Sequence, residues 1–277
     1  MANAIGKGCH LHLIDGSAFI FRAYHALPPL TRASDGLPVG AVSGFVNMLQ
    51  RYIENNAGPD AATHVAVIFD KGSHTFRNDM YDQYKANREA MPEDLRPQIP
   101  LTRDATRAFN IACEEIEGFE ADDIIATLSH MARDAGGRVT ILSSDKDMMQ
   151  LVGDGVEMLD PMKNKRIDRE AVIEKFGVGP ERVVDVQALA GDSVDNVPGA
   201  PGIGIKTAAL LINEFGDLES LLDRADEIKQ PKRRQTLTDH RAQIELSKRL
   251  VQLDCDMTLP FGLDDLEIRD PDPDTLL

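Results

Sequence analysis

Short apolar runs alternate with longer amphipathic stretches along the first 160 residues. Four of the runs end in aspartate: HLHLID at Asp15, HVAVIFD at Asp70, RVTILSSD at Asp145 and VEMLD at Asp160. Each is bounded by glycine or turn residues and is rich in Val, Ile or Leu, which is typical of buried β-strands. The run IACEEIEG, which starts at Ile111, is a weaker candidate for a further strand.

Helical periodicity fills the intervals between these strands. It predicts helices over residues 39–55, 95–110 and 121–133. Strands that alternate with helices predict an α/β fold, with a mostly parallel central sheet and helices on both faces. Ligands of such sheets bind beyond the carboxyl ends of the strands, where three of the strand-end aspartates would lie.

The pattern changes after about residue 168. Helical signals then follow one another without strands, over residues 169–176, 180–190, 205–215, 218–224 and 241–253. We therefore expect three parts: an α/β core over residues 1–168, a helical region over residues 169–260, and an acidic, proline-rich, linker-like tail over residues 261–277.

Composition narrows the class of protein. The 277-residue chain carries a formal net charge of −16, and its 42% hydrophobic residues suffice for a buried core. No apolar run approaches the ~18 residues of a membrane span, and no secretory signal is evident. The three cysteines are widely separated, which argues against a disulfide framework or structural zinc and fits a reducing cytoplasm.

Nucleic-acid binding needs local Lys and Arg side chains. Residues 229–249 hold seven basic side chains against two acidic ones.

Several carboxylates fall where this fold would bring them together. They are the strand-end residues Asp15, Asp70 and Asp145, then Asp147, and a cluster at a helix start, Glu120, Asp122 and Asp123. Each alone could be a turn or capping residue, and a helix start favours anions. A convergent set would repel itself without a bound cation. Oxygen ligands without His or Cys suit Mg²⁺ or Mn²⁺, and two such ions roughly 3.5–4 Å apart can activate water and stabilise a leaving oxygen in phosphodiester hydrolysis.

A further acidic pair lies in LAGDSVDNVPG. Asp192 and Asp195 have the i, i+3 spacing that could point both side chains the same way from a helix end. The pair is a weak signal by itself, because Gly-Asp-Ser is also common in loops.

The stretch GAPGIGIKTAALLINEF, from Gly199, resembles a phosphate loop but lacks the adjacent Gly and Lys of a P-loop, since Ile205 intervenes. We interpret it as the hairpin of a helix–hairpin–helix motif. Gly202 and Gly204 would expose backbone N–H groups at a helix start, with Lys206 beside them, and bind phosphate without reading sequence. A tight glycine-rich turn without a ligand is the alternative.

The segment KGSHTFRNDMYDQYKANREAMPEDLRPQ follows Asp70 directly. Lys85 and Arg88 are three residues apart and would share one face of a helix, with Tyr84 alongside. Cations near a metal site can bind the scissile phosphate, and an aromatic ring can stack on an unpaired base. A solvated amphipathic helix is the alternative interpretation.

Together, six stretches resemble the 5′ nuclease domain at the N-terminus of bacterial DNA polymerase I, within the flap endonuclease superfamily. They are LIDGSAFIFRAYHALPPL, VIFDKGSHTFR, YKANREAMPEDLRPQ, GFEADDIIATL, SSDKDMMQL and GDSVDNVPGAPGIGIKTA, in the family's order over nearly the whole chain. The resemblance implies a PIN-like core and nine metal-site acids: Asp15, Asp70, Glu120, Asp122, Asp123, Asp145, Asp147, Asp192 and Asp195. It implies roles at the phosphate and the displaced strand for Arg22, Tyr84, Lys85 and Arg88.

The same resemblance implies a helical arch over about residues 71–105, the arch segment, through or under which a 5′ single strand passes. The hairpin would hold duplex DNA, often with a K⁺ ion. Candidate DNA contacts are Gly202, Gly204, Lys206, Thr207, Lys232, Arg233 and Arg234.

The implied activity is that of a 5′–3′ exonuclease and flap endonuclease that uses two Mg²⁺ ions, for which Mn²⁺ can substitute. Its substrates would be 5′ flaps, nicks and RNA-primed ends in DNA replication and repair. We expect a monomer in the bacterial cytoplasm, associated with the nucleoid and continuous with a polymerase region in the full-length protein.

Two other functions remain open from the sequence. A PIN-like ribonuclease also gathers acids on an α/β sheet, but it would lack the GIGIKT hairpin and the long arch segment. A DNA-binding module could clamp a junction without cutting it.

Overall fold

The computed structural model describes residues 5–161 and 163–271. At its centre lies a six-stranded sheet in the order β3-β2-β1-β4-β5-β6. The first five strands in the sequence pair in parallel, and β6 pairs antiparallel with β5. The strands are β1 (His10–Asp15), β2 (His64–Ile68), β3 (Ala112–Glu114), β4 (Arg138–Leu142), β5 (Val156–Asp160) and β6 (Lys165–Ile167). The predicted α/β fold with a mostly parallel sheet is confirmed.

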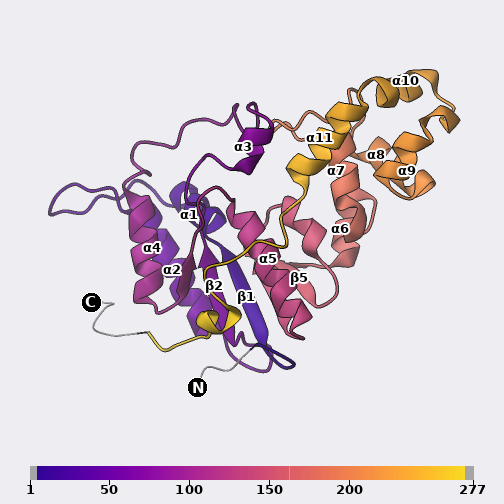
Figure 1. Cartoon of the computed structure of the whole chain (residues 1–277). Helices are drawn as coiled ribbons and strands as arrows, with labels where there is room; N and C mark the ends of the chain where they lie inside the picture. The colour runs from indigo at the N-terminus through magenta and orange to yellow at the C-terminus, as the bar shows by residue number, and fades with distance from the viewer. Residues whose placement is uncertain (1–4, 162, 272–277) are drawn as a thin grey trace.

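Different helices cover the two faces of this sheet (Figure 1). Because successive strand residues point to opposite faces, Leu13 and Ile141 pack with α5, whereas their neighbours Ile14 and Leu142 pack on the other side. The helices of this α/β part are α1 (Gly16–Ala26), α2 (Gly40–Asn55), α3 (Phe76–Met80), α4 (Gln98–Ala108) and α5 (Ala121–Asp134). Helices α2, α4 and α5 lie within three residues of their predicted bounds.

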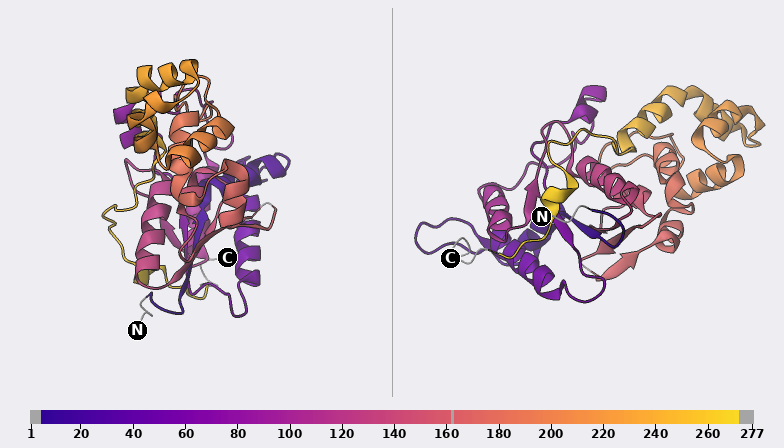
Figure 2. Two further views of the ribbon diagram at one scale, coloured as in Figure 1. Left: turned by 90° about the vertical axis from the view of Figure 1, so that its right-hand side faces the viewer. Right: turned by 60° about the horizontal axis from the view of Figure 1, so that its bottom comes forward.

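The helical region follows β6 and lies beyond one end of the sheet (Figures 1 and 2). Its helices are α6 (Arg169–Phe176), α7 (Val183–Ala190), α8 (Ile205–Phe215), α9 (Leu218–Asp223), α10 (Pro231–Asp239) and α11 (Arg241–Val251). Phe176 and Leu211 belong to the same buried cluster as Leu13 of the sheet. One continuous apolar core therefore joins the helical region to the sheet.

The arch segment differs from its prediction. Within it, α3 spans five residues, residues 81–97 form turns and irregular chain, and α4 begins at Gln98. The expected helical face shared by Lys85 and Arg88 is therefore wrong. Lys85 has a φ of 56°, in the left-handed region that a helix interior excludes, and its amide donates to the Asp195 carbonyl over 2.9 Å. Docking onto the loop that carries Asp195, rather than helix formation, fixes this segment.

The prediction of a linker-like tail is also partly wrong. Residues 261–271 include a short 3-10 helix, Leu263–Leu266, whose last residue is fully buried. The Ile268 amide then donates to the Thr63 carbonyl over 3.1 Å, beside the start of β2. This part of the tail is packed structure, and residues 272–277 lie outside the described residues. No helix in the described part of the chain is long and apolar enough to cross a bilayer.

Candidate active site

A cavity of about 530 Å³ opens at the carboxyl ends of β1, β2 and β4. Eight of the nine predicted metal-site acids line it: Asp15, Asp70, Glu120, Asp122, Asp145, Asp147, Asp192 and Asp195. Four cations also line it: Lys85, Arg88, Lys146 and Lys175. The ionised side chains would give the cavity a formal charge of −4, so its walls favour added positive charge.

Asp15 ends β1 and caps α1, so the strand-to-helix turn fixes its carboxylate. Oδ1 accepts from the Ala18 amide over 2.9 Å, and Oδ2 accepts from the Ser143 hydroxyl over 2.8 Å. Burial, reinforced by the nearby carboxylates of Asp70 and Asp145, raises the pKa of Asp15 to about 6. Helix α1, which starts at the residue after Asp15, was not predicted from the sequence.

Asp70 follows β2 and links it to two helix starts. Its carboxylate accepts from the Ser17 hydroxyl over 2.6 Å and from the Ala121 amide over 2.9 Å. Arg103 of α4 donates to its backbone carbonyl over 2.7 Å. Neutral donors on α1 and α5 therefore hold this carboxylate at the floor of the cavity.

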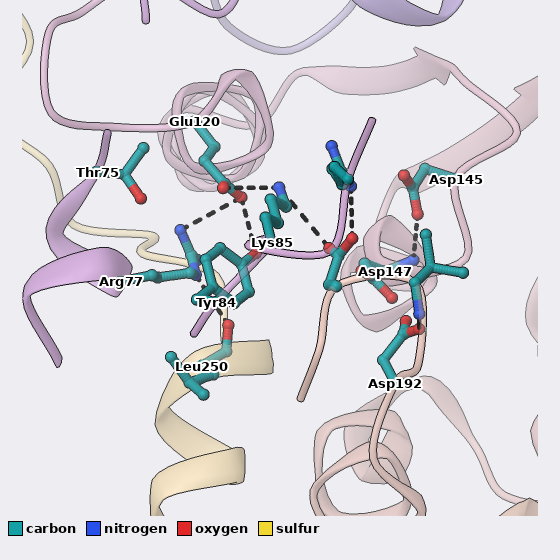
Figure 3. A network of polar contacts seen from close by, with 12 residues as sticks. Thr75, Arg77, Tyr84, Lys85, Glu120, Asp145, Asp147, Asp192 and Leu250 are labelled. Carbon is teal, nitrogen blue, oxygen red and sulfur yellow. Dashed lines mark hydrogen bonds and ion pairs between the residues drawn. The ribbon is translucent and has the colours of Figure 1, made fainter. Parts of the chain in front are cut away.

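The three acids at the start of α5 point in different directions. Glu120 accepts from Lys85 Nζ over 2.7 Å, and Arg77 Nη1 lies 3.6 Å from its second oxygen (Figure 3). Asp122 lines the cavity, and no hydrogen bond or ion pair to its carboxylate is found among the described residues. Burial first, and then the charges of Asp145 and other acids, raise its pKa well above the ordinary value.

Asp123 faces the core instead. Its side chain is fully buried and forms two 2.7 Å hydrogen bonds with the guanidinium of Arg77, which is itself 1% exposed. It also accepts from the Asp254 amide over 2.9 Å, and Arg77 Nε donates to the Leu250 carbonyl over 2.8 Å. Asp123 does not line the cavity, so we withdraw it from the expected metal ligands. It joins α3, α5 and the chain that follows α11.

The other side of the cavity carries the remaining acids (Figure 3). Asp147 Oδ1 accepts from Gln187 Nε2 over 2.5 Å, and burial followed by the Asp145 charge raises the pKa of Asp147 to about 7. Lys146 Nζ lies 2.5 Å from Asp192 Oδ2. Gln187 and Lys146 were not among the predicted site residues. The sequence held a signal for each: Gln187 is polar within the mostly apolar run VVDVQALA, and Lys146 lies between two expected ligands.

The cations from the arch segment reach these acids. Arg88 Nη2 lies 2.5 Å from Asp195 Oδ1, and Lys85 Nζ lies 3.7 Å from Oδ2 of the same residue. Tyr84 is 5% exposed and packs with Val197 and other apolar side chains, so the expected stacking of its ring on an unpaired base does not fit this structure. Its hydroxyl instead donates to Glu120 over 3.3 Å.

Arg22 is not among the residues that line the cavity. Its Nη1 atom is buried and finds no hydrogen-bond partner within residues 5–161 and 163–271. The expected contact between Arg22 and a phosphate therefore stays a prediction.

The donor atoms that line the cavity determine which metal ions fit it. Across the described residues, no group of three His, Cys, Asp or Glu side chains forms a ready-made metal site. Lysine and arginine side chains hold Glu120, Asp192 and Asp195 instead. The donors are carboxylate oxygens in excess over cations, which suits hard divalent ions. The residues fit Mg²⁺-like ions, provided that these lysine and arginine contacts rearrange.

The predicted hairpin lies between α7 and α8, outside the cavity. Gly202 is exposed with a φ of 76°, and Gly204 precedes the first residue of α8. Lys206 is exposed on the first turn, and Thr207 is half-buried. The basic residues Lys232, Arg233 and Arg234 lie on α10, at the outer end of the helical region (Figure 1).

Comparisons with known proteins agree with this architecture. A family model described as "5'-3' exonuclease, N-terminal resolvase-like domain" matches residues 10–177, and one described as "5'-3' exonuclease, C-terminal SAM fold" matches residues 178–274. The chain is 59% identical to DNA polymerase I of Rhizobium leguminosarum over 95% of its length, but it spans only 26% of that protein. It is 37% identical to the 5'-3' exonuclease of Aquifex aeolicus and covers 88% of it.

Solved structures share the fold. The T5 D15 protein co-crystallised with metal ions superposes with a TM-score of 0.76 at 23% identity, over 88% of this chain and 90% of that one. The catalytic core of Rad2 in complex with DNA substrate superposes with a TM-score of 0.59 at 16% identity, over 99% and 86% of the two chains. The two matched family models together cover most of the sequence, and the chain belongs to the 5'-3' exonuclease family.

Proposed function

We propose that this chain hydrolyses phosphodiester bonds of DNA at junctions between single strand and duplex, with two divalent cations bound in the acidic cavity. The observation that carries the proposal is the convergence of eight carboxylates at the carboxyl end of the sheet, beside cations of the arch segment. When bound, such ions activate water and stabilise the departing oxygen. The metal ions in the T5 D15 protein and the DNA in the Rad2 complex support this assignment.

The chain's own residues would hold the ions and the phosphate. Asp15, Asp70, Glu120, Asp122, Asp145, Asp147, Asp192 and Asp195 supply the oxygen ligands. Lys85 and Arg88 already lie within 4.0 Å of these acids, so a phosphate that enters the cavity meets both side chains. They would position the scissile phosphate and offset charge that develops on it. Mg²⁺ is the proposed ion, and Mn²⁺ should replace it.

The two other parts would select the substrate. The arch segment runs across the top of the α/β part in Figure 1, and its Lys85 and Arg88 line the cavity, so a 5′ single strand would pass beneath it. The hairpin at Gly202 and Gly204, with Lys206 and Thr207, would hold the duplex backbone, and a K⁺ ion could bind the same turn. Lys232, Arg233 and Arg234 would add phosphate contacts, so DNA affinity should fall as salt rises.

We further propose that the domain is continuous with a polymerase region in the full-length protein. The chain matches about a quarter of DNA polymerase I from Rhizobium leguminosarum. It would act as a monomer at the nucleoid in the bacterial cytoplasm, on nicks, flaps and RNA-primed ends.

The test is cleavage of a labelled 5′-flap duplex with Mg²⁺ and, separately, with EDTA. We expect cleavage near the junction with Mg²⁺ and none with EDTA. A blunt duplex of the same sequence and a single-stranded RNA are the control substrates. Binding without products in Mg²⁺ would instead indicate a clamp, and preferential cleavage of the RNA would indicate a ribonuclease. Either result would contradict the proposal.

A further inference from the structure

Lys146 is a cavity cation to which the sequence alone assigned no role. It lies between Asp145 and Asp147, just before a short 3-10 helix, Asp147–Leu151. Its ammonium group lies 2.5 Å from Asp192 Oδ2, and its side chain is 33% exposed. Lys146 therefore holds a carboxylate on the far side of the cavity from Glu120, the partner of Lys85.

The Asp192 carboxylate has little freedom to serve a second partner. Its Oδ1 atom accepts from the Val194 amide over 2.8 Å. Its backbone pairs with Val197 in both directions, over 2.9 and 2.7 Å, and the residue is 7% exposed. The loop thus fixes both the backbone and one oxygen of Asp192. Oδ2 is the oxygen without a backbone donor, and Lys146 contacts that atom.

A divalent ion and Lys146 cannot share this oxygen at low cost. A carboxylate ligand lies about 2.0–2.1 Å from Mg²⁺. An ammonium at hydrogen-bond distance from the same oxygen would stand close to the ion, with strong repulsion inside a partly buried cavity. Lysine can give way, because its charge sits on a flexible four-carbon stem with three rotatable donors.

We propose that Lys146 is an internal counter-ion that competes with a divalent cation for Oδ2 of Asp192. This inference rests on the proposed function, because it assumes that the cavity binds divalent ions. Lys146 stabilises Asp192 until an ion takes its place, and it then swings into the cavity. The competition sets the ion concentration at which the part of the cavity around Asp145, Asp147, Asp192 and Asp195 loads.

The test measures Mn²⁺ binding to the whole chain without DNA, by titration calorimetry and by the electron paramagnetic resonance of free Mn²⁺. Lys146→Met keeps the length of the side chain and removes its charge. We expect the weaker Mn²⁺ binding step to tighten about tenfold in this variant, and Lys146→Arg to stay close to wild type. Without Mn²⁺ the Met variant should melt at a lower temperature, because Asp192 loses its counter-ion, and Mn²⁺ should raise its Tm more than it raises that of wild type.

Lys175→Met is the matched control. Lys175 lies on α6 and lines the same cavity, but it forms no ion pair with any of the described residues. Its loss changes the field of the cavity and leaves the Lys146–Asp192 contact in place, so we expect less than about a twofold change in Mn²⁺ affinity.

Three outcomes decide the matter. Tighter Mn²⁺ binding in the folded Lys146→Met variant but not in Lys175→Met supports the inference. Equal changes in both variants, or unchanged or weaker binding in Lys146→Met, would overturn it and leave the proposed function standing. If the wild-type chain binds no Mn²⁺ at all, the proposed function fails and the inference fails with it.

Discussion

Asp122 and Asp123 are neighbours on the first turn of α5, and their surroundings differ completely. Asp122 faces a cavity of like charges, and burial and those charges raise its pKa. Asp123 is fully buried and pairs through both oxygens with Arg77. Successive residues on a helix point about 100° apart, so one side chain reaches the cavity and the next reaches the core.

The comparison shows two ways in which a protein can hold a buried carboxylate. A paired charge such as Asp123 is stable within the fold, because a cation and backbone donors satisfy it. An unpaired charge such as Asp122 destabilises the fold until a cation arrives. The second arrangement favours the binding of a cation, as an ion-binding site requires. Four predictions test this contrast.

The largest effect is expected from Asp122→Asn. This substitution removes a cavity charge and keeps the shape of the side chain, so cleavage should fall by roughly 10³-fold or more while flap binding is retained. The Tm without divalent ions should hold or rise, because repulsion is relieved. Single-turnover cleavage and thermal unfolding measure the two effects. Undiminished cleavage would remove Asp122 from the site.

The matched substitution Asp123→Asn should act on stability instead. Arg77 would keep its buried charge and lose its paired carboxylate, with Glu120 still 3.6 Å away. We expect a loss of about 3–5 kcal/mol in the free energy of unfolding. Denaturant unfolding measures this loss, and Mn²⁺ titration of the folded variant is the control. If the variant were as stable as wild type but failed to bind Mn²⁺, Asp123 would be a metal ligand after all.

The pH dependence of stability should distinguish the carboxylates of the cavity from the paired carboxylate of Asp123. The pKa of Asp15 is raised to about 6 and that of Asp147 to about 7, so between pH 5.5 and 8 the folded state binds more protons than the unfolded state. Stability without divalent ions should therefore fall as pH rises through this window, by about 1–3 kcal/mol. Thermal melts across the range measure it.

Divalent ions and the two variants sharpen this pH test. Saturating Mg²⁺ should abolish the fall, because bound ions replace the protons. Asp122→Asn should flatten the fall as well, whereas Asp123→Asn should leave its slope unchanged. A stability that rises with pH without divalent ions would contradict the account of a repulsive cavity.

The smallest effect is expected from Ser143→Ala. The Ser143 hydroxyl donates to Asp15 over 2.8 Å and accepts from the Asp145 amide over 3.1 Å, so its loss removes two hydrogen bonds and no charge. We expect a loss of about 1–2 kcal/mol in stability and a modest loss of activity. Denaturant unfolding beside Asp123→Asn measures the difference. A loss as large as that of Asp123→Asn would mean that neutral donors and a cation stabilise buried carboxylates equally here.

Much of the fold was predictable because it depends on local patterns. The apolar runs that end at Asp15, Asp70 and Asp145 are buried on both faces of a parallel sheet, and their composition shows it. Helix α6 was predicted at its observed bounds, and it lies between two residues typical of helix ends, the N-cap Asp168 and the C-cap Gly177.

What the sequence could not show depends on contacts between distant residues. The backbone of Lys85 is left-handed, and its amide donates to the carbonyl of Asp195, which lies 110 positions later in the sequence. The partner of Asp123 is an arginine 46 residues earlier, and no spacing rule links the two. Helix α10 was missed because its residues are almost entirely polar, with Leu237 its one buried residue. The tail was misread because its composition is acidic, while Leu266 anchors it in the core.

Anomalous scattering from a crystal of the chain soaked in Mn²⁺ would locate the bound ions relative to Asp122 and Asp123. We expect strong Mn²⁺ peaks in the cavity, in contact with carboxylates that include Asp122, and none at Asp123, which stays paired with Arg77. A cavity without Mn²⁺ at saturating concentration, or an ion bound to Asp123 in place of Arg77, would contradict this expectation.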